Sequence, residues 1–312
     1  MKNKYSIGLI VIFVIVFAIV AARIVFEYHK KGILSDYKYD FRWIDNKPCA
    51  YITKYTGSKE VVTVPTKIGF LSVKEIDENT YKRNTTIKKI IIPAEFDGLL
   101  YFDNNDILTT VEYAEGIEKL KGSFLNCKNL REVIIPQSTL YSDANFEGCE
   151  SLEDVKFPEN MRSVFGIDFE GTAFEKNHSD DKYYVVGDGV LLFYNGSQTD
   201  IVIPTGIKCV AADDILNDDS ENKEATIYYP DTVKIDIGGL PTSATGFYLN
   251  SDIEISNQEW TYYKGLIVAP NDSVMAGHAN KYGFNYREIT EAEVAELKEK
   301  TEAAVSEIIY QK

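Results

Sequence analysis

Histidine and cysteine are scarce in this chain, which holds three histidines and four cysteines among 312 residues. His29, His178 and His278 have no i, i+3 or i, i+4 spacing to one another or to a cysteine, which argues against a zinc site. Cys209 and His278 are the one conceivable nucleophile and base, but neither has a local signature. Glycine-rich phosphate loops and the Gly-x-Ser-x-Gly elbow are also missing. The sequence therefore predicts a protein that is not an enzyme, with no catalytic, cofactor-binding or metal-binding residues.

Basic charge is low as well. The chain has 33 lysines and arginines against 48 aspartates and glutamates, a net charge of −15. Residues 1–31 contain five of the basic side chains and one acidic side chain, so the remainder carries 28 basic against 47 acidic groups, a net −19. Nucleic-acid binding requires a basic surface that displaces counterions from phosphates. This balance predicts no nucleic-acid partner.

One long hydrophobic run is present, near the N-terminus. Ile7–Ala22 has no charged residue, and Ile24–Phe26 extend the run past Arg23. Together they approach the roughly 20 residues that a membrane-spanning helix needs, whereas the apolar part of a cleavable signal usually has about 7 to 15. We expect residues 1–31 to be an uncleaved signal anchor, a single transmembrane helix in the cell membrane with an extracellular C-terminal body. Cleavage after Val20-Ala21-Ala22 is the alternative.

Four segments beyond this run repeat one pattern with almost no gaps: Tyr81–Pro93, Phe102–Ala114, Phe124–Pro136 and Phe146–Pro158. Each begins with an aromatic residue, followed by Asn or Cys three positions later, Ile or Leu six later and Ile or Val nine later. The aromatic residues lie 21, 22 and 22 positions apart, and Phe169 continues the series. Such a period is typical of a leucine-rich-repeat solenoid. We expect mainly parallel β-structure with short turns and helices, in which the aromatic residues and the valines form columns.

A second start of the repeats indicates two stacks. The pattern from Tyr55 to Ile68 returns from Tyr194 to Ile207 at a constant offset of 139 residues. We therefore divide the chain into five parts. After the anchor we expect a stalk over 32–50, a leucine-rich repeat stack over 51–175, a second, irregular stack with its cap over 176–288, and a helix over 289–312. Asn177–Asp188 is expected to be an insertion or hinge between the stacks.

The C-terminal region changes period. Asp272–Lys281 is predicted to be a short helix with Asn271 or Asp272 as its N-cap and Gly283 as its stop, followed by a strand over Phe284–Ile289. Thr290-x-x-Glu293 is a capping box. The apolar stripe behind it predicts an amphipathic helix, which we expect to cover the open end of the solenoid; the stripe consists of Val294, Leu297, Thr301, Ala304 or Val305, and Ile308.

Cys127 and Cys149 occupy one phase of adjacent repeats. Their Cα atoms are expected about 5 Å apart, inside the window for a disulfide, but parallel side-chain vectors make the bond awkward. Asn84 and Asn105 hold the same phase in earlier repeats. This favours a buried turn that needs a small hydrogen-bonding side chain, with free thiols.

An acidic stretch lies in the second stack. Asp213, Asp214, Asp218, Asp219 and Glu221 are dense enough in carboxylates to suggest Ca²⁺, but they lack the spacing and the glycine of an EF-hand loop. A solvated acidic loop is the favoured interpretation.

The repeats resemble the BspA-type leucine-rich repeat family. The resemblance is carried by Phe146-Glu-Gly-Cys149-Glu-Ser-Leu152-Glu-Asp-Val155-Lys-Phe157-Pro158 and by the matching string from Phe124 to Pro136. It covers roughly residues 50–288, and Ala114, Asn84 and Asn105 depart from it. The resemblance implies a right-handed solenoid with a parallel sheet on one face and a cell-surface role in adhesion or recognition, mostly in bacteria. It implies no enzyme.

We therefore expect a membrane-anchored cell-surface leucine-rich-repeat protein that binds an unknown protein or glycan outside the cell, without catalysis or a small-molecule substrate. A first alternative is a structural envelope or assembly component that self-associates, in part through its terminal helix. A second is an enzyme with an unrecognised site in residues 176–288. Surface tyrosines on a sheet face would suit a binding surface, but the sequence does not say which of the 21 tyrosines lie there.

Overall fold

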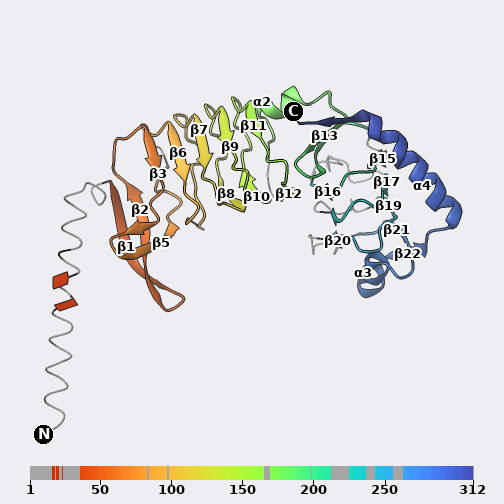
Figure 1. Ribbon diagram of the computed structural model, residues 1–312, viewed down its shortest axis with the longest axis horizontal. Helices are drawn as coiled ribbons and strands as arrows, with labels where there is room; N and C mark the ends of the chain where they lie inside the picture. Colours follow the sequence, from red (N-terminus) through yellow and green to blue (C-terminus); the bar gives the residue numbers. More distant parts are fainter. Residues whose placement is uncertain are drawn as a thin grey trace, which may run out of the picture.

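The computed structural model describes residues 36–82, 84–96, 98–164, 169–197, 199–211, 225–236, 243–255 and 263–311, together with residues 16, 17, 19, 20 and 23. Its coils stack into an arch (Figure 1). The arch begins with β1 (Tyr37–Ile44) and β2 (Lys47–Tyr55) at one end and reaches α3 (Val274–Tyr282) and β22 (Asn285–Glu288) at the other. The solenoid predicted from the repeat period is confirmed.

The outer side of the first stack is a five-stranded parallel sheet in the order β11-β9-β7-β6-β3 (Figure 1). Its strands are β3 (Val61–Thr63), β6 (Lys89–Ile92), β7 (Thr110–Tyr113), β9 (Glu132–Ile134) and β11 (Asp154–Lys156). Val111, Val133 and Val155 are direct partners in neighbouring strands and are buried. The predicted valine column therefore exists, and the repeat phase sets the register of this sheet.

A second parallel sheet lies on the inner side of the arch (Figure 1). It consists of β8 (Lys119–Ser123), β10 (Tyr141–Asn145) and β12 (Ser163–Val164), in the order β12-β10-β8. The sequence predicted one sheet face for each repeat, so this inner sheet is an addition to the expected fold.

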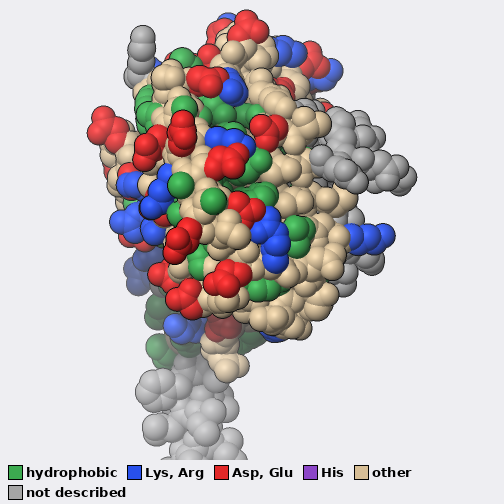
Figure 2. All heavy atoms as spheres, turned by 90° about the vertical axis from the view of Figure 1, so that its right-hand side faces the viewer, with side chains coloured by type: hydrophobic (Ala, Val, Ile, Leu, Met, Phe, Trp, Pro, Cys, Tyr) green, Lys and Arg blue, Asp and Glu red, His purple; other side chains and the backbone are tan. Residues whose placement is uncertain are grey.

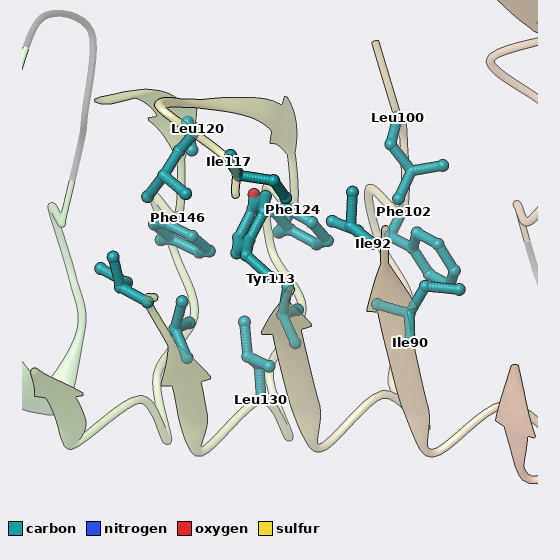
Figure 3. Packing of buried hydrophobic residues seen from close by; sticks show 14 of the residues in the cluster. Ile90, Ile92, Leu100, Phe102, Tyr113, Ile117, Leu120, Phe124, Leu130 and Phe146 are labelled. Atoms are coloured by element: carbon teal, nitrogen blue, oxygen red, sulfur yellow. The ribbon is translucent and has the colours of Figure 1, made fainter. Parts of the chain in front are cut away.

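The predicted aromatic column fills the space between the two sheets. Tyr81, Phe102, Phe124, Phe146 and Phe169 stack in that order, with ring centroids 4.6, 6.1, 5.3 and 5.8 Å apart and interplanar angles of 19° or less. All five are buried, and Figure 3 shows Phe102, Phe124 and Phe146 between the strands. Offset stacking of this kind adds to the stabilisation from burial.

Asn and Cys at the shared turn position perform related tasks. The side-chain oxygen of Asn105 accepts hydrogen bonds from the backbone N–H groups of Ile107 and Leu108. The Cys127 and Cys149 thiols donate to the carbonyl oxygens of Phe102 and Phe124, one coil earlier, at 3.2 and 3.1 Å.

All four cysteines are free and buried, as the predicted turn role of Cys127 and Cys149 requires. The neighbouring Cys149 thiol, followed by burial, raises the pKa of Cys127 well above its usual range. The Cys127 thiol is therefore a protonated structural group.

A mixed sheet opens the stack at its N-terminal end, in the order β1-β2-β5-β4. It contains β1 (Tyr37–Ile44), β2 (Lys47–Tyr55), β4 (Lys67–Ile68) and β5 (Leu71–Ile76). Residues 32–50 were expected to be a stalk; from Tyr37 onward they instead form an antiparallel hairpin closed by Asp45 and Asn46, both with positive φ. The physical reason is the alternation of aromatic and polar residues in Tyr-Lys-Tyr-Asp-Phe-Arg-Trp, which is the period of a strand.

The second stack also has two sheets. Its outer sheet is parallel, in the order β15-β17-β19-β21-β22, and its inner sheet has the order β20-β18-β16-β14-β13-β23. The outer strands are β15 (Asp200–Val202), β17 (Thr226–Tyr229), β19 (Thr245–Tyr248), β21 (Leu266–Ala269) and β22 (Asn285–Glu288). The inner strands are β13 (Tyr183–Val186), β14 (Val190–Tyr194), β16 (Cys209–Val210), β18 (Ile235–Asp236), β20 (Glu254–Ile255) and β23 (Ile308–Tyr310).

The junction between the stacks is packed, which corrects the expected hinge over Asn177–Asp188. A short helix, α2 (Ala173–Asn177), leads into β13. Tyr184 and Val186 of β13 belong to the same buried cluster as Phe146 and Phe169. Because these inward side chains are large and apolar, the core continues through the junction.

Helix α3 (Val274–Tyr282) starts two residues later than predicted, with Ser273 as its N-cap in place of Asn271 or Asp272, and ends at the predicted Gly283. Ser273 takes the cap because its hydroxyl accepts from the N–H of Ala276. Met275 and Ala279 are buried in the core, and α3 packs against β21 and β22 at the end of the arch (Figure 1).

Helix α4 (Glu291–Ala303) begins with a capping box formed by Thr290 and Glu293. We expected this helix to cover the open end of the solenoid. It lies instead along the outer sheet of the second stack (Figure 1). The reason is that this sheet is apolar on its outward side as well: Leu297 and Val294 pack with Val268 and Phe247.

The chain then returns to the junction. After a 3₁₀ turn (Ala304–Glu307), Ile308, which the predicted helical stripe included, begins β23, and this strand pairs in parallel with β13. The side-chain amide of Gln311 donates to the carbonyl of Val155 at 2.7 Å and accepts from the N–H of Phe157 at 3.0 Å. We call residues 308–311 the C-terminal clasp, because they join the edge strand β11 of the first stack to β13 of the second.

Within the described residues, no helix is long and apolar enough to span a bilayer. The predicted anchor, residues 1–31, falls outside the described part of the chain except for Val16, Phe17, Ile19, Val20 and Arg23. The acidic stretch Asp213–Glu221 also lies outside it.

Candidate binding surface

The side chains considered for catalysis lie in separate places. Cys209 is buried in β16, within the cluster that contains Phe174 and Val190. His278 lies on α3 beside the rings of Tyr282 and Phe284, with centroids 4.6 and 5.9 Å away. Burial, followed by the charge of Lys281, lowers the pKa of His278. The described structure thus gives no support to a Cys209–His278 pair.

The other described histidine has a structural environment. His178 follows α2, its Nδ1 lies 2.7 Å from a carboxylate oxygen of Asp181, and its ring centroid is 3.8 Å from that of Tyr184. Among the residues that the structure describes, no group of three or more His, Cys, Asp or Glu side chains is placed to hold a metal ion. His29 lies outside the described residues.

Many of the tyrosines that the structure describes are in the core rather than on a surface. Tyr81, Tyr113, Tyr183, Tyr229 and Tyr248 are all buried. Tyr101 and Tyr141 differ, because each points outward from the inner side of the first stack, where Tyr141 is 40% exposed. Side chains alternate along β10, so Tyr141 can be assigned to the outward side once the strand is known. The repeat pattern in the sequence does not indicate this direction.

The outward residues of β8, of β10 and of residues 99–101 in the preceding coil form one surface, which we call the inner face. Its residues are Leu99, Tyr101, Lys119, Lys121, Tyr141, Asp143 and Asn145. Adjacent strands place Tyr141 opposite Lys119, Asp143 opposite Lys121, and Tyr101 beside Ser123. Lys119 and Asp143 form an ion pair at 3.3 Å, and Leu99 is 50% exposed. The inner face therefore offers aromatic, aliphatic and charged groups on a rigid sheet.

A cavity of about 260 Å³ opens beside the inner face. Lys119 and Lys121 line it together with the apolar side chains of Ile92, Phe96 and Ile117. The hydroxyl of Tyr113, which also lines the cavity, donates to the carbonyl of Lys121 at 3.2 Å, and burial raises the pKa of Tyr113, so the phenol is neutral. Pockets for small ligands usually measure about 300 to 1,000 Å³. This cavity lies just below that range and has both charged and apolar side chains in its lining.

The other sheet faces are less suited to binding. On the outer face of the first stack, Lys89 and Glu112 pair with each other, and Asp154 and Lys156 alternate in sign. The outer sheet of the second stack is covered by α4. Figure 2, which looks onto that end of the molecule, shows acidic and basic side chains interspersed over the surface.

One family model and two solved structures are similar to this chain. Residues 63–179 match the model of the BspA type leucine rich repeat region in six copies. The chain is similar to the crystal structure of a leucine rich repeat protein of T. pallidum, with 15% identity over 81% of this chain and 96% of that chain and a TM-score of 0.26. It is also similar to a leucine rich cell surface protein from Faecalibacterium prausnitzii A2-165, with 12% identity over 85% and 96% and a TM-score of 0.23.

No curated protein matches the sequence significantly. The matched repeats include β6, β7, β9 and β11, the strands whose register the aromatic and valine columns fix, as well as the whole inner face. Over residues 63–179, this chain is thus similar to the BspA-type leucine-rich repeat family.

Proposed function

We propose that this protein is a membrane-anchored cell-surface protein that binds another macromolecule, a protein or glycan, through the inner face. The observation that carries the proposal is the combination of the exposed Leu99 and Tyr141 with the half-buried Tyr101 and Lys121 beside a cavity. Aromatic side chains are enriched at the centres of interfaces, and polar groups surround them at the rim. Leucine-rich repeat proteins generally bind other proteins, and no catalytic role is part of the proposal.

Membrane anchoring is supported by sequence. Residues 7–26 contain one charge, Arg23, and are long enough to span a bilayer. The acidic remainder of the chain agrees with a soluble body held outside the membrane. Protease shaving of intact cells, followed by mass spectrometry, tests this arrangement. Release of peptides from residues 50–312, with residues 1–31 retained in the membrane, is the expected result, and full protection of the repeats would contradict it.

Binding is tested with a panel of immobilised cell-surface proteins, matrix proteins and glycans. The full chain is compared with a Tyr141→Ala, Lys121→Glu variant and with a matched control, Ile134→Ala, Lys156→Glu, on the outer face of the same stack. We expect saturable binding to at least one component, with the loss confined to the inner-face variant. Equal loss in the control, or no binding by the parent chain, would refute the proposed site.

Self-association through the terminal helix would require a free apolar side on that helix. Leu297 of α4 is buried against the molecule's own sheet, so the apolar side of this helix is already in use. Analytical ultracentrifugation of the parent chain separates the two functions, because a concentration-dependent oligomer without other binding would favour the structural alternative.

A further inference from the structure

The β1–β2 hairpin carries an uncovered aromatic pair. Phe41 and Trp43 are 54% and 68% exposed, and their rings meet edge to face with centroids 5.9 Å apart. Isolated apolar side chains are common on protein surfaces, but large adjacent aromatic rings outside a core are typical of contact sites. The pair therefore requires an explanation beyond the fold.

The hairpin directs this pair away from the solenoid. Phe41 and Trp43 are two positions apart and share one face of β1, with Ala50 and Pro48 as their partners in β2. Ala50 and the next residue on that side of β2, Ile52, are buried in the core. The side of the hairpin that carries Phe41 and Trp43 is therefore the side that faces the core at Ala50 and Ile52. Near Phe41 and Trp43, no other element among the described residues covers it. Small partner side chains leave both rings open.

The hairpin is also tethered close to the proposed anchor. Ten residues separate Phe26, the end of the apolar run, from Tyr37, the start of β1. A fully extended chain advances at most about 3.6 Å per residue, so β1 begins within about 40 Å of the end of the run. The solenoid's own N-terminal strands are the part of the described structure that the tether holds nearest the bilayer.

Local charge agrees with that position. Residues 37–55 contain four basic and two acidic side chains, whereas the chain after residue 31 carries a net −19. One of the four, Arg42, is paired with Glu75 and lies over the ring of Tyr51; the others are Lys38, Lys47 and Lys54. Anionic lipid headgroups attract lysines near the surface, while the rest of the acidic body is repelled.

We propose that Phe41 and Trp43 insert into the headgroup region of the membrane and hold the N-terminal end of the solenoid against the bilayer. Tryptophan and other amphipathic rings prefer this interface. The inference rests on the anchoring proposed above, to which it adds a second, non-covalent contact that fixes the orientation of the arch.

Tryptophan fluorescence of the full chain in vesicles of phosphatidylcholine and phosphatidylglycerol provides the test. The chain has two tryptophans, so Trp260→Phe leaves Trp43 as the reporter. The matched control carries Trp43→Phe, Trp260→Phe and Ile134→Trp, which moves the reporter to the outer sheet of the first stack. Each protein is exposed to iodide in the water and to a lipid with a nitroxide on its headgroup, and flotation measures its membrane association.

If the inference is correct, the nitroxide lipid quenches Trp43 and iodide does not, with the opposite pattern for the control. A chain that floats with the vesicles while Trp43 remains open to iodide refutes the hairpin contact and leaves the anchor intact. A chain that does not float refutes the anchor itself. Protection of Trp43 from both quenchers overturns the lipid contact in favour of a protein contact, either with a second copy or with residues 27–35.

Discussion

Truncation of Phe146 tests whether the aromatic column holds the first stack together. The ring is fully buried and stacks on Phe124 at 5.3 Å and on Phe169 at 5.8 Å, with interplanar angles of 7° and 12°. Alanine in its place removes the middle ring of a continuous series and leaves an apolar void. Substitutions of this kind in cores cost about 3 to 5 kcal/mol.

The structure places Phe146→Ala in the upper part of that range. An aromatic pair contributes about 0.5 to 1.5 kcal/mol beyond burial, and two such pairs are lost. The coils on both sides are fixed by strand pairing in two sheets, so the void has little freedom to collapse. Against a typical folding stability of about 5 to 15 kcal/mol, a loss of about 4 to 5 kcal/mol is severe, and it falls on two adjacent coil interfaces.

Equilibrium urea unfolding, followed by far-ultraviolet circular dichroism, measures the loss. A lower midpoint with an unchanged slope indicates lost stability. Phe146→Leu is expected to lose less, because it retains most of the volume. Ile134→Ala, 37% exposed on the outward side of β9, is expected to cost about 1 kcal/mol or less. If Phe146→Ala costs no more than Ile134→Ala, the column does not hold the stack together and the reasoning fails.

Three further predictions concern other parts of the molecule. Gln311→Ala leaves two backbone groups of the β11 edge without the clasp amide, and urea unfolding is expected to show a loss of about 1 to 3 kcal/mol; no change would mean that the clasp does not stabilise the junction. Glu293 has its pKa lowered from 4.5 to about 2 by its hydrogen bond with Arg287 and then by the N–H of Thr290, so its stabilisation is complete above pH 4.5 and is lost as the pH falls toward 2. Thermal unfolding of Glu293→Gln should therefore approach that of the parent chain near pH 2, and a constant difference across this range would contradict the assignment. The four buried thiols should react with a thiol reagent at the rate of unfolding, and fast labelling of the native protein would show that the thiols are accessible.

Local periodicity explains why the first stack was predictable. Each repeat supplies its own aromatic residue, valine or isoleucine, and turn side chain within about 20 residues, and neighbouring repeats supply the same groups one coil away. The columns through Phe124 and Val133 follow from this spacing alone. The inner sheet was missed because Lys119–Ser123 and Tyr141–Asn145 are polar segments with few inward apolar residues, Leu120 and Ala144 among them. Such strands form because they pair with the strands of neighbouring coils, and the local sequence pattern does not show this pairing.

The candidate site, too, was predictable only where it depends on local spacing. The spacing indicated a solenoid but not which tyrosines lie on its surface. Tyr141 belongs to the inner face because β10 turns it outward. The apolar spacing that placed Ile308 on a helix also suits a strand, and its partner Tyr183 is 125 positions earlier in the chain. A contact at that separation leaves no trace in a local pattern. The positions of α4 and of the clasp therefore required the structure.

The C-terminal clasp has a consequence for how the chain is made. A solenoid normally grows coil by coil, since each coil needs only its predecessor. Here the amide of Gln311 reaches back 154 and 156 positions to Phe157 and Val155. While the ribosome is still translating the second stack, the β11 edge has no Gln311 to cover it, and open sheet edges promote aggregation. Protection of nascent chains by a chaperone that binds exposed strands should therefore matter until residue 311 has left the ribosome.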